Sequence, residues 1–68
     1  MFAITQDQKI LMLVEKESDA RDVLMNVNKI LDKMTLKNLD KVMDKIYHIF
    51  PDSGELNPFV AFRMKEYK

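Results

Sequence analysis

The sequence lacks several residue types on which small proteins depend. None of its 68 residues is cysteine, so disulfides and thiolate metal sites are excluded. Histidine occurs once, at His48, which excludes a histidine-rich metal cluster. We therefore expect neither a metal nor a cofactor. A chain of this length buries only about 60% of the surface that its unfolded form exposes, so tight packing or association with another chain must stabilise it.

An excess of charge and a long apolar run are also missing. The chain has 11 basic and 11 acidic residues, whereas proteins that bind duplex nucleic acid carry an excess of Lys and Arg. The longest apolar run, Ile10 to Val14, is far shorter than the roughly 20 residues that cross a bilayer. The first residues do not have the basic start and apolar core of a signal peptide. We expect a cytoplasmic protein with no membrane partner and no nucleic-acid partner.

Two amphipathic helices are predicted in the middle of the chain. Between Ser18 and Met34 the apolar residues other than Met25 fall within an arc of about 120°, and Ser18 suits the N-cap. Between Thr35 and Phe50 a second apolar arc spans about 140° to 160°. Pro51 ends this second helix because it has no backbone N–H to donate. The short connection between the two arcs predicts an antiparallel helical hairpin.

The two ends of the chain also carry helix signals. Thr5-Gln6-Asp7-Gln8 matches a capping box, followed by a helix over residues 6–16. Asn57-Pro58-Phe59 matches a helix start, with proline at the first helical position. We predict an all-α fold, a small helical bundle over residues 1–68 built on the central antiparallel hairpin with short flanking helices.

An alternative architecture for the ends is βααβ. The five-residue apolar run from Ile10 to Val14 also suits a buried strand. Val60, Phe62 and Met64 alternate in the way that strand residues do. Residues 9–15 and 58–67 therefore stay open between helix and strand.

The segment VNKILDKMTLKNLDKVMDKI, Val27 to Ile46, is similar to a helix pair of a known family. It resembles the first helix pair of the HEAT-type middle domain of translation-initiation scaffolds, which has an Asn or Asp-Lys-Leu-Thr turn between two amphipathic helices. The resemblance covers 20 of the 68 residues and implies a helical hairpin. No function follows from it.

Catalysis is not expected from this set of side chains. His48 would need a nucleophile or a second acid beside it, and the chain has two serines, Ser18 and Ser53, both at cap or turn positions. We therefore predict a protein that is not an enzyme.

The apolar residues exceed what one helical hairpin covers, because each arc is wider than a two-helix seam. We expect another protein or a second copy of the chain to cover the surplus, with a homodimer favoured. The predicted function is that of a small regulatory or adaptor protein binding through an apolar helical face. Frequent Lys, Asn, Asp, Ile and Met suit an AT-rich genome, as in a phage- or virus-encoded modulator of a host protein. The candidate partner-binding residues are Met12, Met25, Leu36, Met43, Tyr47, Phe50, Phe59 and Phe62.

A small dimeric DNA-binding transcription regulator is the alternative function. Lys37, Lys41 and Lys45 share one side of the second helix and would face the phosphates. Asp40 and Asp44 lie immediately beside them and would repel the same phosphates. A solvated face of mixed charge is therefore the favoured interpretation of this stripe.

Overall fold

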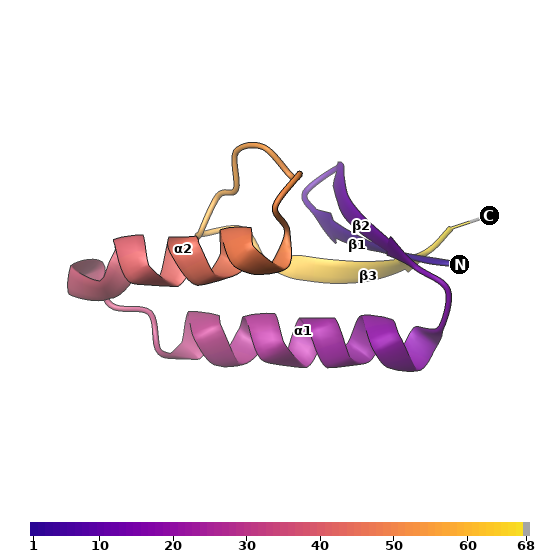
Figure 1. The fold of residues 1–68 in the computed structure, drawn as a ribbon, viewed down its shortest axis with the longest axis horizontal. Coiled ribbons are helices and arrows are strands. Elements are labelled where there is room, and N and C mark those ends of the chain that lie inside the picture. Colours follow the sequence, from indigo (N-terminus) through magenta and orange to yellow (C-terminus); the bar gives the residue numbers. More distant parts are fainter. Residues whose placement is uncertain (68) are drawn as a thin grey trace.

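The computed structural model describes residues 1–67 and shows a mixed α/β fold with the element order ββααβ (Figure 1). The prediction of an all-α helical bundle is therefore wrong, since three antiparallel strands form a sheet. The strands are β1 (Phe2–Gln6), β2 (Lys9–Val14) and β3 (Phe62–Glu66). The helices are α1 (Glu17–Asp32) and α2 (Leu39–Ile49), and a 3-10 turn, η1 (Leu36–Asn38), precedes α2.

The sheet joins the two ends of the described chain. Its strand order is β2-β1-β3, so the first strand is central and the last strand is its neighbour. Phe2 lies opposite Val14 on one side and opposite Glu66 on the other. The start of β1 and the end of β3 consequently lie together at one end of the molecule (Figure 1). The backbone N–H of Tyr67 continues this pairing by donating to the carbonyl of Met1 over 2.9 Å.

The helix predicted over residues 6–16 is wrong, because this segment belongs to a β-hairpin. Thr5-Gln6-Asp7-Gln8 is the end of β1 and its turn, and Asp7 has a left-handed backbone with φ of 57°. Asp adopts this conformation more readily than most residues. The pairing shifts between Ile4, opposite Met12, and Thr5, opposite Ile10, so that Leu11 is an extra residue in β2. This bulge lets Leu11 and Met12 both pack against the core, which hides the alternation typical of a strand.

The helix predicted to start at Asn57-Pro58-Phe59 is also wrong. Asn57 forms a local turn in which its Oδ1 accepts from the backbone N–H of Phe59 over 3.0 Å. The chain then enters β3 rather than a helix. The βααβ alternative identified strand character near both ends but missed β1, the central strand.

The two central helices are confirmed, with different caps. α1 covers most of the segment from Ser18 to Met34, and η1 with α2 covers the segment from Thr35 to Phe50. The N-cap of α1 is Lys16 and not Ser18, and neither Lys16 nor Thr35 makes a side-chain cap bond. The apolar stripes are therefore sufficient to define these helices.

One core forms between the sheet and the helices. The two helices run antiparallel beside each other, and α1 packs against all three strands (Figure 1). Ile4 of the central strand is fully buried together with Val27 of α1 and Ile46 of α2. The rings of Phe50 and Phe62 stack with centroids 5.5 Å apart, which attaches the end of α2 to β3.

A buried amide fastens the loop between α2 and β3 to the central strand. The side chain of Gln6, 5% exposed, accepts from the N–H of Asn57 over 2.9 Å. Its Nε2 donates to the carbonyl of Asn57 and, over 2.8 Å, to that of Val60. Each polar atom of this amide has a partner, as buried polar groups require.

Replacing this amide by an apolar side chain tests its role in stability. We expect Gln6→Leu to lower the free energy of unfolding by about 1–3 kcal/mol, because it removes three part-buried hydrogen bonds to the backbone of Asn57 and Val60. Gln8→Leu, at the exposed hairpin turn, is the matched control and should change stability little. Urea unfolding followed by circular dichroism measures both. Equal effects of the two substitutions would contradict this role.

Candidate protein-binding surface

The face of the sheet that points away from the helices is not covered by any element within residues 1–67. We call it the open face and define it by Ala3 and Thr5 of β1, Ile10 and Leu13 of β2, and Arg63 and Lys65 of β3. The register places these residues in two rows. Ala3 lies between Leu13 and Lys65, and Thr5 lies between Ile10 and Arg63.

The middle of the open face is hollow because its central strand contributes small side chains. Ala3 and Thr5 form the floor, while longer residues stand on both neighbouring strands. The hollow has a volume of about 430 Å³, within the range of about 300–1,000 Å³ found for ligand sites. Its lining residues are Ala3, Thr5, Asp7, Gln8, Ile10, Lys65 and Tyr67.

The walls of the hollow differ in chemistry. Ile10 and Leu13 on β2 remain 47% and 48% exposed, and Tyr67 beyond β3 remains 45% exposed. On β3, Arg63 and Lys65 are exposed cations that alternate with the core residues Phe62 and Met64. Along the described chain, the one ion pair joins Arg21 to Glu17 and involves neither cation. The open face therefore offers an apolar side and a positively charged side around a small-residue floor.

A second hollow of similar volume lies by the hairpin turn and the loop that precedes β3. It is lined by Gln6 and Asn57, whose polar groups already bond to each other. Its remaining lining is mainly charged or polar, with Val60 as the apolar exception. The open face is therefore the better candidate for binding through apolar contact.

The candidate residues predicted from the sequence do not gather on one surface. Met25, Leu36 and Phe59 are 56%, 87% and 76% exposed, but they belong to α1, to η1 and to the loop before β3. Tyr47 is 36% exposed, and its hydroxyl accepts from the backbone N–H of Leu56 over 3.1 Å.

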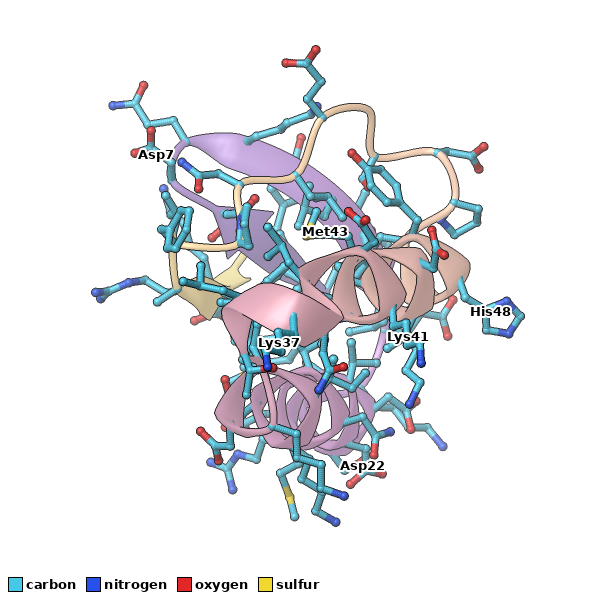
Figure 2. All side chains as sticks on the ribbon, turned by 90° about the vertical axis from the view of Figure 1, so that its left-hand side faces the viewer. Asp7, Asp22, Lys37, Lys41, Met43 and His48 are labelled. Carbon is cyan, nitrogen blue, oxygen red and sulfur yellow. The ribbon has the colours of Figure 1, made fainter. Side chains whose placement is uncertain are left out.

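The other four candidates contribute to the protein's own core. Phe50 and Phe62 are buried and stack on each other, so neither side chain lies at the surface. Met12 and Met43 are half-buried against the core, and Figure 2 shows Met43 on the side of α2 away from α1. These four side chains are therefore engaged in contacts within the chain.

Sequence reasoning missed the residues of the open face because it did not assign the strands. A signal was present in β3, where Phe62, Arg63, Met64 and Lys65 alternate between apolar and basic. In β1, the small Ala3 and Thr5 alternate with the larger Phe2 and Ile4. Period-two alternation of this kind separates a core face from an outer face.

Substitutions on opposite faces of the sheet test whether the open face is uncovered in solution. We expect Ile4→Thr to cost about 2 kcal/mol or more, since it places a hydroxyl in the core. Leu13→Thr should change the free energy of unfolding by about 0.5 kcal/mol or less, since its side chain is largely solvated. Urea unfolding of both variants measures the difference. A cost for Leu13→Thr equal to that for Ile4→Thr would show that this face is covered.

Signatures of specific chemistry are few in the described part of the chain. No group of three or more His, Cys, Asp or Glu within residues 1–67 is placed to hold a metal ion. His48 is exposed, and Figure 2 shows its ring pointing away from the rest of the molecule. Neither α1 nor α2 combines the length and the apolar character that crossing a membrane requires.

No protein-family model, no curated protein and no solved structure matches this chain.

Proposed function

We propose that this chain is a small, non-enzymatic regulatory or adaptor protein that binds another protein through the open face of its sheet. The observation that carries the proposal is the exposure of Ile10, Leu13 and Tyr67 around a hollow floored by Ala3 and Thr5. The proposed binding surface is thus the open face of the sheet, and not the apolar helical face that the sequence predicted. Val27 and Ile46 of the apolar helical stripes are 0% exposed in the core, so these two residues offer no surface to a partner.

Burial of this face by a partner supplies a favourable free energy. Fully burying an aliphatic side chain is worth about 1.5–3 kcal/mol. Ile10 and Leu13 are about half exposed, so each contributes about half of that amount when covered. The floor itself is buried, with Ala3 1% and Thr5 9% exposed, so an apolar side chain of the partner would pack mainly against the flanking Ile10 and Tyr67. Such an anchor in a pocket is typical of the residues that dominate protein–protein binding.

The charges of the open face favour a partner that carries carboxylates. Arg63 and Lys65 lie side by side on β3, one on each row. A carboxylate beside the anchoring side chain would pair with either of them, and complementary charges increase the association rate and the specificity. A second copy of this chain would present its own cations, with Asp7 as the carboxylate at the hollow. An acidic partner protein therefore matches the face better than a homodimer does.

A cytoplasmic location is part of this proposal. The absence of cysteine from all 68 residues suits a compartment in which disulfides do not form. There the protein would bind and modulate its partner without chemistry of its own.

Site-specific photo-crosslinking in the cells that produce the protein tests the proposed surface. We expect Leu13→benzoylphenylalanine to give a discrete adduct with a second protein, because this position is exposed on the open face opposite Ala3. Met25→benzoylphenylalanine is the matched control, since Met25 is also exposed but lies on α1. It should give no such adduct.

A charge reversal on β3, across the sheet from Leu13, tests whether the partner carries carboxylates. Lys65→Glu should weaken the Leu13 adduct if the partner presents carboxylates there. An adduct with the mass of two copies of this chain would show that the open face binds a second copy and not another protein. Equal labelling from Leu13 and Met25 would contradict the proposal.

A further inference from the structure

A second feature of the surface lies between the two helices, away from the open face. Here a cavity of about 120 Å³ is lined by Lys29, Ile30 and Lys33 of α1 and by Val42 and Lys45 of α2. We call it the lysine groove. All three charged residues in its lining are cations, although the whole chain has no net charge.

We propose that the lysine groove binds a compact phosphate-type anion, either inorganic phosphate or the phosphate group of a small phosphorylated molecule. Lysine is an established phosphate ligand, acting as a point charge. The three lysines that line the groove supply more positive charge than one phosphate neutralises, so a doubly charged phosphate is favoured over a singly charged anion. This inference is independent of the function proposed for the open face.

The groove combines positive charge with an apolar floor. Val42 is 6% exposed and Ile30 is half-buried, so both contribute apolar surface to the lining of the groove. Lysine stems pack along such apolar surface while their charged ends stay at the mouth. Opposite charges attract more strongly beside low-dielectric material than in open water. An anion held in the mouth would therefore interact with the lysines more strongly than on a flat, solvated surface.

The described chain does not neutralise these lysines itself. Over residues 1–67 the one ion pair joins Arg21 to Glu17 near the start of α1, with 2.6 Å between the charged atoms. Lys41, one turn before Lys45, adds to the positive charge: in Figure 2 it extends from α2 toward the level of α1. Like charges held close together repel each other, and an external anion relieves this repulsion.

The size and surroundings of the groove favour a compact ligand over a nucleic-acid backbone. Its volume of about 120 Å³ equals that of about four water molecules in the liquid. Asp40 and Asp44 are exposed on α2 but do not line the groove. An extended polyanion lying across α2 would meet these two carboxylates, whereas a single phosphate between the helices would not.

Lys29 also stabilises α1, so a substitution there would change both helix stability and anion binding. It lies in the last turn of α1, where a cation stabilises the negative end of the helix dipole. Lys33 and Lys45 are therefore the better positions for a test. Lys16, exposed at the start of α1, provides a matched lysine outside the groove.

Amide chemical shifts of the full chain, measured by NMR during titration at pH 7.5, test the inference. The probes are inorganic phosphate and glycerol phosphate, with sodium chloride at equal ionic strength as the blank. We expect saturable shifts at the amides of Ile30 and Val42 with at least one phosphate probe. Binding by glycerol phosphate as well as phosphate would identify phosphate esters as the ligand class, and binding by phosphate alone would identify the free ion.

Variants assign the binding to the groove. Lys33→Gln and Lys45→Gln should each raise the dissociation constant by about tenfold, the equivalent of one lost charge-assisted bond. Lys45→Arg keeps the charge and should retain binding, and Lys16→Gln should have no effect. All three substituted positions are exposed, so the unliganded spectra of the four variants should stay well dispersed.

Three results would overturn the inference. The first is shifts that do not saturate or that match those caused by chloride. The second is an equal loss of binding in Lys16→Gln, which would indicate diffuse attraction to the whole surface. The third is tighter, steeply salt-dependent binding of duplex DNA through the same lysines, which would make the groove part of a nucleic-acid surface.

Discussion

The rest of this structure depends on one arrangement: α1 packs across one face of the three-stranded sheet and also along α2, and side chains of both helices meet those of the sheet in one core. Ile4 in the central strand is buried against them, while its neighbour Ala3 points to the opposite face. Because α1 packs on one face of the sheet and α2 packs along α1, no further element within residues 1–67 is left for the other face. The core and the open face are thus two consequences of the same packing.

The sheet also requires contacts between residues far apart in the sequence. β1 is central, so its second edge is filled only when the C-terminal segment returns as β3. Gln6 supports this return by holding the carbonyls of Asn57 and Val60, and the stacked rings of Phe50 and Phe62 hold the end of α2 against β3. The loop between α2 and β3 is therefore fastened at both of its ends. This fastening aligns Arg63 and Lys65 beside Thr5 and Ala3, as the open face requires.

The sequence predicted the helices correctly because their apolar period is a local property. It failed at the strands for two physical reasons. The bulge at Leu11 turns consecutive residues toward the core, so the run from Ile10 to Val14 has no alternation to detect. The pairing of β1 with β3 spans almost the whole chain, and no local pattern reveals such pairing. The open face was missed for the same reasons, and an exposed helical methionine such as Met25 was considered in its place.

The open face is free of cover from the described part of this chain, and the function that we propose requires it to be available to a partner. The most direct measurement is the relaxation of methyl NMR signals by a neutral, soluble paramagnetic probe in dilute protein. The account predicts strong broadening at Ile10 and Leu13 and almost none at Ile4 and Ile46, which are fully buried. Protection of Ile10 and Leu13 equal to that of Ile4 would contradict it, because the face would then already be covered.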